Sequence, residues 1–71
     1  MQVYKITPTD QYVGGCALVA AKSVEEAIKE FCKDDYYAFQ YEDYTCTCNI
    51  IIGLDYDTKS SCVIFNCLYE S

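Results

Sequence analysis

One segment, residues 23–33, constrains the fold more than any other, because it joins a helix cap to an amphipathic stripe. Ser23 and Glu26 have the spacing of a capping box, in which each side chain binds the backbone amide of the other residue. Apolar residues follow at the helical period, with charged residues between them, at Val24, Ala27, Ile28, Phe31 and Cys32. This pattern predicts a helix that packs one face against a sheet, with Phe31 lying deepest.

Two strands are predicted before this helix. Residues 2–7 alternate in character, and we expect Tyr4 and Ile6 to face the interior. Residues 16–21 form a short apolar run after the glycine pair 14–15, and a run of this length suits a buried strand. Because the connection between the two strands is short, we expect them to form an antiparallel hairpin.

The later part of the chain predicts further strands. The clearest strand period covers residues 45–54, and the residues expected to face the helix are Cys46, Cys48, Ile50, Ile52 and Leu54. A turn at 55–60 leads to a last predicted strand at 61–69. With another strand at 36–41, the element order is β-β-α-β-β-β. We therefore predict an α+β two-layer sandwich, a mostly antiparallel four- to five-stranded sheet with one helix on one face, forming a single small domain over residues 1–71.

The segment 34–44 is unusual, because it contains five aromatic residues, four acidic residues and no basic residue. Its alternation predicts the strand at 36–41, although a helix is the alternative, since Tyr37, Tyr41 and Tyr44 also lie at helical spacing. The rings either cover the sheet or form a recognition surface, for which tyrosine is well suited. The residues predicted to bind a partner are Asp34, Asp35, Tyr36, Tyr37, Phe39, Tyr41, Glu42, Asp43 and Tyr44.

Charge and composition narrow the function classes. Acidic residues exceed basic ones by 11 to 5, which gives a formal net charge of −6, and the chain has neither arginine nor histidine. Without arginine or a basic stripe, direct binding of nucleic acid is disfavoured. Without histidine, the commonest general base and metal ligand is missing. We therefore expect no catalysis, no cofactor and no bound metal.

The chain contains six cysteines, at Cys16, Cys32, Cys46, Cys48, Cys62 and Cys67. No apolar run is long enough to span a membrane and no secretory signal is visible, so we expect a cytoplasmic protein with reduced thiols that behave as small apolar side chains. A disulfide framework is an alternative that would allow about 15 pairings. The Cys46-x-Cys48 spacing offers only weak support for zinc or thiol chemistry.

Apolar residues on both sides of the predicted strands indicate that the sheet associates with another chain. A helix of about ten residues is about 15 Å long and cannot cover both faces of a sheet. The far face is expected to carry some of Val3, Ala17, Val19, Ile51, Ile64 and Leu68. Such a patch predicts a partner or an isologous homodimer. From the acidic, aromatic segment 34–44 we predict a protein–protein interaction module that binds another protein with a basic surface. The alternatives are a homo-oligomeric structural or assembly protein that associates through the apolar face, and an inhibitor of the phage or mobile-element type that mimics nucleic-acid charge.

Overall fold

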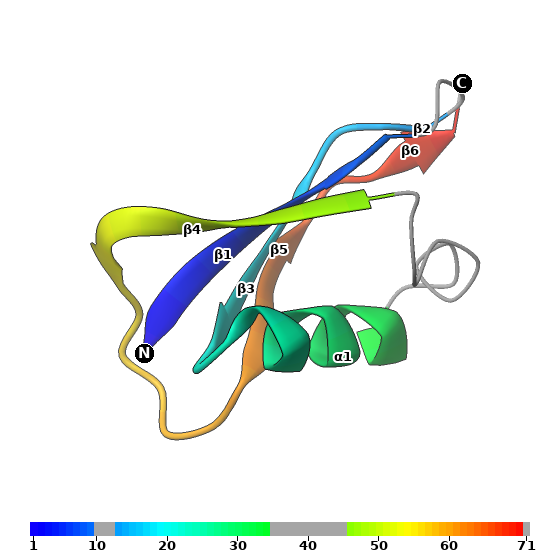
Figure 1. Ribbon diagram of the computed structural model, residues 1–71. Coiled ribbons are helices and arrows are strands. Elements are labelled where there is room, and N and C mark those ends of the chain that lie inside the picture. Colours follow the sequence, from blue (N-terminus) through cyan, green and yellow to red (C-terminus); the bar gives the residue numbers. More distant parts are fainter. Residues whose placement is uncertain (10–12, 35–45, 71) are drawn as a thin grey trace.

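The computed structural model describes residues 1–9, 13–34 and 46–70, and its elements are one helix and six strands (Figure 1). In chain order they are β1 (Gln2–Pro8), β2 (Val13–Gly14), β3 (Ala17–Ala21), α1 (Val24–Asp34), β4 (Cys46–Asp55), β5 (Cys62–Asn66) and β6 (Tyr69–Glu70). Four strands form an antiparallel sheet in the order β4-β1-β3-β5, and α1 packs on it. The predicted α+β class, with one helix on an antiparallel sheet, is confirmed.

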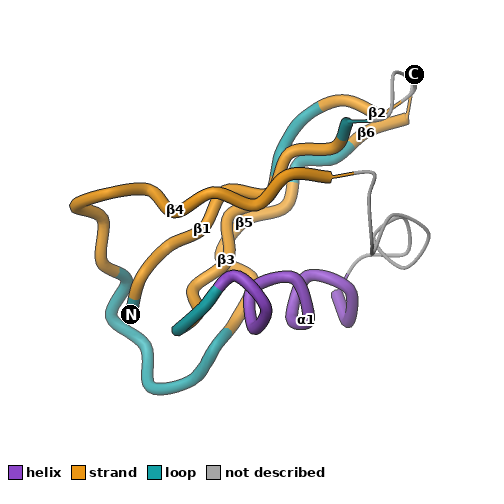
Figure 2. The backbone as a smooth tube through the Cα atoms, viewed as in Figure 1, coloured by secondary structure: helices purple, strands orange, loops and turns teal. Residues whose placement is uncertain are grey.

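The first two long strands form the centre of this sheet. β1 and β3 pair as the predicted antiparallel hairpin, with Tyr4 opposite Val19 and Ile6 opposite Ala17. β4 joins β1 on one side and β5 joins β3 on the other, so both late strands are edge strands. The short strands β2 and β6 pair with each other and form a narrow ribbon that extends beyond the end of the main sheet (Figure 2).

The hydrophobic core lies between α1 and the central hairpin. Its buried residues are Tyr4, Ile6, Ala17, Val19, Ala21, Ala27 and Phe31. The helical stripe correctly predicted that Phe31 is buried, at 2% exposed, although Ala27 of the same helix is buried more completely, at 0%. Alanines on β3 and α1 leave room for the helix to lie close to the sheet, and the two aromatic rings fill the remaining space.

The start of α1 has the predicted cap on one side only. The backbone amide of Glu26 donates to Ser23 Oγ over 3.1 Å, which satisfies one of the amides at the helix N-terminus. The Glu26 carboxylate accepts a hydrogen bond from the Ser61 hydroxyl, so it ties the helix to the segment before β5. The second half of the capping box is therefore used for a tertiary contact.

The predicted apolar patch on the far face was wrong for its central residues. Ala17 and Val19 face the helix and are fully buried. Val3 lies on the side of β1 opposite Tyr4, as predicted, but it is only 1% exposed and so forms no exposed patch. Leu68 packs against the same core cluster. The run 16–21 is apolar at every position, so its own pattern does not specify which side faces inward; pairing with Tyr4 and Ile6 does.

Two later expectations also need correction. Of the residues predicted to face the helix from β4, Cys46 and Cys48 pack against the core, whereas Ile50, Ile52 and Leu54 are exposed. The single strand predicted at 61–69 is divided into β5 and β6. β5 also carries a register shift, because Leu18 pairs with Phe65 while Val19 pairs with Val63, and the extra residue changes which side chains face the core.

Two glycines with positive φ allow the cost of left-handed backbone strain to be separated from the cost of a steric contact. Gly15 has φ of 88° and Gly53 has φ of 84°. A Cβ at position 15 would lie 2.1 Å from the carbonyl oxygen of Cys67, whereas a Cβ at position 53 would meet nothing within 4 Å. We expect Gly53→Ala to lower the free energy of unfolding by about 1–2 kcal/mol through left-handed strain alone, and Gly15→Ala to lower it further. Urea denaturation measures both; equal losses would contradict the close contact at Gly15.

Candidate functional site

Strand β4 leaves the sheet over residues 51–54. Ile50 pairs with Tyr4 of β1 and Asp55 pairs with Gln2, so four residues of β4 stand opposite the single residue Val3. Extra residues in one strand interrupt the ladder and bend the backbone outward. Gly53, with its positive φ, lies within this bend. We refer to residues 50–54 as the β4 bulge.

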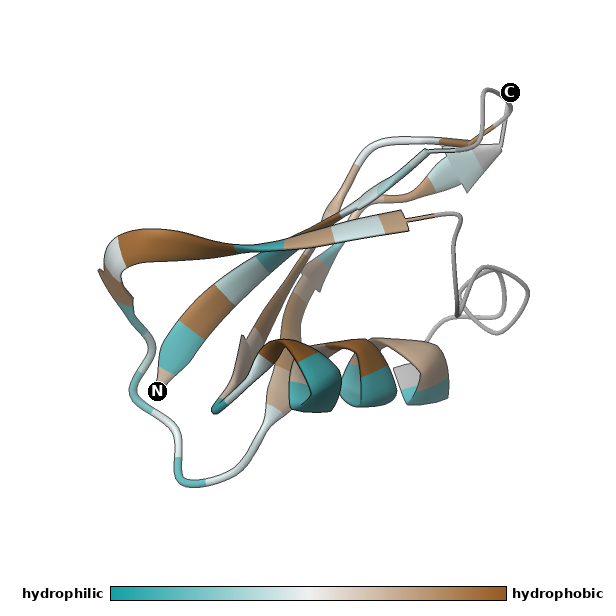
Figure 3. Ribbon diagram, in the orientation of Figure 1, coloured by the Kyte–Doolittle hydropathy of each residue, from teal (hydrophilic) through white to brown (hydrophobic). Residues whose placement is uncertain are grey.

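The β4 bulge presents large aliphatic side chains to solvent. Ile52 is 91% exposed, Leu54 is 47% exposed and Ile50 is 42% exposed. Figure 3 shows strongly hydrophobic colouring along this bend of β4, in contrast to the hydrophilic outer side of α1. Burying one such side chain is worth about 1.5–3 kcal/mol, so exposed aliphatic residues grouped on one bend favour a contact surface.

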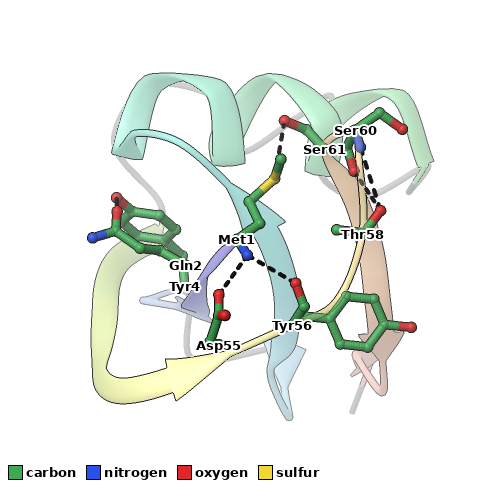
Figure 4. A network of polar contacts seen from close by, with 8 residues as sticks. All are labelled: Met1, Gln2, Tyr4, Asp55, Tyr56, Thr58, Ser60 and Ser61. Atoms are coloured by element: carbon green, nitrogen blue, oxygen red, sulfur yellow. Dashed lines mark hydrogen bonds and ion pairs between the residues drawn. The ribbon is translucent and has the colours of Figure 1, made fainter.

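The far end of the β4 bulge is held by contacts with Met1 (Figure 4). The Met1 ammonium group pairs with the Asp55 carboxylate and donates to the Tyr56 carbonyl oxygen over 2.8 Å. In return, the Tyr56 amide donates to the Met1 carbonyl oxygen over 2.8 Å. With Ile50 paired to β1 at the near end, both ends of the bulge are fixed. A surface fixed in this way loses little conformational entropy when it binds.

The connection from β4 to β5 is also tied down. The Thr58 hydroxyl donates to the Ser60 carbonyl oxygen over 2.9 Å, which closes a tight turn. Ser61 then binds Glu26 of α1 through its hydroxyl group. The bulge is therefore attached to β1 at both ends, and the connection that follows it is attached to the helix.

The partner surface that the sequence predicts lies outside the described residues, apart from its first member. Asp34 is the last residue of α1, and residues 35–44, including the strand predicted at 36–41, are not among those described. Sequence reasoning missed the β4 bulge because strict alternation assigned its aliphatic side chains to the interior. The available signals were Gly53 inside a strand pattern, which indicates a bulge, and three consecutive isoleucines at 50–52.

The thiols of Cys46 and Cys48 do not have the lowered pKa of an activated nucleophile. None of the six cysteines, all within the described part of the chain, forms a disulfide. Partial burial raises the pKa of Cys46, and burial together with the charge of Cys46 raises the pKa of Cys48 to about 11. A raised pKa leaves the thiol protonated near neutral pH, which is the unreactive form.

The described residues also offer a shallow pocket and no group of side chains suited to a metal ion. A shallow pocket of about 300 Å³ lies between α1 and β5, lined by Glu30, Lys33, Ser61, Cys62 and Val63. Lys33 Nζ lies 3.3 Å from Glu30 Oε1 at its rim. Within residues 1–9, 13–34 and 46–70, no three acidic or cysteine side chains are grouped to hold a metal ion.

Comparison with known proteins gave no significant match to a family model, to a curated protein or to a solved structure. Among the described residues, no helix is both long and apolar enough to cross a membrane.

The raised pKa of Cys48 predicts a slow and pH-dependent reaction with alkylating agents. Its pKa of about 11 lies above the ordinary value of 9.0, so the thiolate fraction near neutral pH is lower in the folded chain than in the unfolded chain. We expect Cys48 to react up to about 100-fold more slowly in the native protein than in urea. The native rate should keep rising between pH 9 and pH 11, where the unfolded chain reaches its plateau. Peptide mass spectrometry measures both; equal rates at pH 8 would contradict the shift.

Proposed function

We propose that this chain is a protein–protein interaction module without catalytic activity, and that the β4 bulge is part of its contact surface. The observation that carries the proposal is the exposure of Ile52, at 91%, on a bend whose two ends are fixed. Apolar side chains at the centre of a contact, presented on a rigid support, are typical of residues that dominate binding energy. The raised thiol pKa values and the absence of histidine from the sequence support a non-catalytic role.

The chemistry of the partner follows from the residues next to the bulge. Asp55 and Asp57 are exposed immediately after it, with the ring of Tyr56 between them, and the whole chain carries a net charge of −6. The predicted partner-binding segment 34–44 contributes four further acidic residues to the chain. An apolar centre beside carboxylates suits a protein with an apolar cleft bordered by lysine or arginine, because complementary charge speeds association and selects the partner.

The proposal also covers the cellular location of the protein and the alternative role as a nucleic-acid mimic. We place the protein in the cytoplasm, in agreement with thiols that form no disulfide, and we expect neither a membrane nor a nucleic acid as its direct ligand. An inhibitor that mimics nucleic-acid charge remains a prediction from the acidic segment 34–44. The β4 bulge does not favour that role, since it is uncharged.

The β4 bulge can be tested with one substitution and a matched control. Ile52→Ser should weaken binding to the partner by about 2 kcal/mol, or roughly 30-fold, because the isoleucine side chain would no longer be buried in the complex. Phe65→Ser is the control, since Phe65 is a large apolar side chain, half exposed, on the opposite edge strand. Partners captured from the cells that make the protein are identified by mass spectrometry, purified and titrated against each variant.

The control separates specific binding from general stickiness. The proposal predicts that Phe65→Ser keeps the affinity of the parent chain and that raising the salt concentration weakens the complex. A partner that binds Ile52→Ser as tightly as the parent chain would contradict a role for the bulge. Equal weakening by both substitutions would indicate nonspecific hydrophobic capture and would also count against it.

One observation favours a second candidate, a homodimer formed by β4 itself. Within the described ranges, no strand pairs with the outer edge of β4, and residues 46–54 carry no charge although the chain is strongly acidic. Natural edge strands are usually protected by charges or proline. Antiparallel pairing of two copies of β4 would join the sheets across a two-fold axis with little charge repulsion.

The dimer is tested by light scattering over a concentration series, with and without reductant. Pairing through β4 predicts that the mass doubles as concentration rises, and that Asn49→Lys, which places a charge on the edge strand, restores the monomer. Ser60→Lys adds the same charge outside β4 and should leave the dimer intact. A monomer at all concentrations would exclude the homodimer and leave a different protein as the partner.

A further inference from the structure

The narrow ribbon and the main sheet share one strand register. Gly14 of β2 pairs with Tyr69 of β6, and Ala17 of β3 pairs with Asn66 of β5. Continuing from either pair brings Cys16 directly opposite Cys67. The backbone agrees with this placement, because the Cys67 amide donates to the Cys16 carbonyl oxygen over 3.0 Å.

Cysteines that face each other in an antiparallel ladder meet the main geometric condition for a disulfide. Because the Cys67 amide donates to the Cys16 carbonyl oxygen, the pair is of the hydrogen-bonded type, in which Cα atoms lie about 5.5 Å apart; disulfides span Cα separations of about 4.4–6.8 Å. Cys16 and Cys67 lie between the assigned strands, and the register shared by the pairs on either side of them places their side chains on the same face. The Cβ atoms of a hydrogen-bonded pair lie about 5.5 Å apart, so they need to approach by about 1–2 Å to reach the disulfide range of about 3.5–4.5 Å.

The backbone beside this pair is adapted to close approach. Gly15 lies next to Cys16. Only a residue without a Cβ atom fits at this position, because an added Cβ would lie 2.1 Å from the Cys67 carbonyl oxygen. Gly14 likewise lies under the ring of Tyr69. These two glycines therefore let the strands that carry the thiols come together and adjust.

The other four cysteines are placed differently. Cys46 and Cys48 are two residues apart on one strand, pack against the core and have raised pKa values. Cys62 pairs opposite Ala20, and Cys32 lies on α1. Cys67 is exposed and Cys16 is half-buried, so an oxidant can reach the pair.

We propose that Cys16 and Cys67 form a disulfide when the chain meets a small-molecule disulfide such as oxidised glutathione. The Cys67 thiolate attacks one sulfur of the oxidant, forming a mixed disulfide and releasing one glutathione thiolate. The Cys16 thiolate then attacks the Cys67 sulfur, and the second glutathione leaves as thiolate. Two protein thiols are oxidised and one oxidised glutathione is reduced to two glutathione molecules, so electrons and protons balance.

The disulfide would link two segments that are adjacent in space but lie near opposite ends of the sequence. It fastens the ribbon of β2 and β6 to the main sheet and closes a loop over residues 16–67. Cross-linking residues this far apart in sequence restricts the unfolded chain strongly, and small domains gain most from such a link. The disulfide would form whether or not the β4 bulge binds a partner.

The test uses oxidised glutathione on the native protein, followed by alkylation, trypsin and mass spectrometry without reductant. The expected product joins tryptic peptide 6–22 to tryptic peptide 60–71, which contains both Cys62 and Cys67. The matched variants separate these two thiols. Cys67→Ser should abolish the linked peptide, whereas Cys62→Ser should keep it.

Thermal unfolding provides a second readout. Oxidation should raise the unfolding midpoint of the parent chain by roughly 10 °C, and should not raise that of Cys16→Ser. Three results would overturn the proposal: a linked peptide that persists in Cys67→Ser, a disulfide between Cys46 and Cys48 as the main product, or a disulfide-linked dimer in place of the internal bond.

Discussion

The antiparallel pairing of β1 with β3 is the contact on which the rest of the structure depends. It places Tyr4 opposite Val19 and Ile6 opposite Ala17, and thereby decides which side of each strand receives the helix. A shift of this pairing by one residue would turn the inward side chains of one of the two strands to the other face and remove part of the surface on which Phe31 packs. Both edge strands attach to this hairpin, and the helix packs on the hairpin as well as on β4 and β5.

Local signals in the sequence were sufficient for the helix and for the hairpin. The cap at Ser23 and the stripe ending at Phe31 act within a few residues of each other, so they can be read without knowing the fold. The strand order could not be derived, because it depends on which distant segments meet. The uniformly apolar run 16–21 has no alternation, and its inward side follows only from the register with β1.

The candidate surface was missed for a related reason. Alternation predicts which residues share a face only while a strand stays in its ladder, and β4 leaves the ladder after Ile50. From that point the same pattern points Ile52 into solvent. Gly53 indicated a break, but neither its size nor its direction could be deduced, because both depend on the pairing of Asp55 with Gln2 and on the contact of Asp55 with Met1.

The core contains an unusual share of small side chains, since four of the ten buried hydrophobic residues in the described part of the chain are alanines: Ala17, Ala20, Ala21 and Ala27. Alanine exposes little apolar area when a chain unfolds, and the heat-capacity change of unfolding grows with the apolar area exposed. The stability of this protein should therefore change only gradually with temperature, with a broad maximum. A binding partner that covers the aliphatic side chains of β4 would steepen that curve as well as raise it.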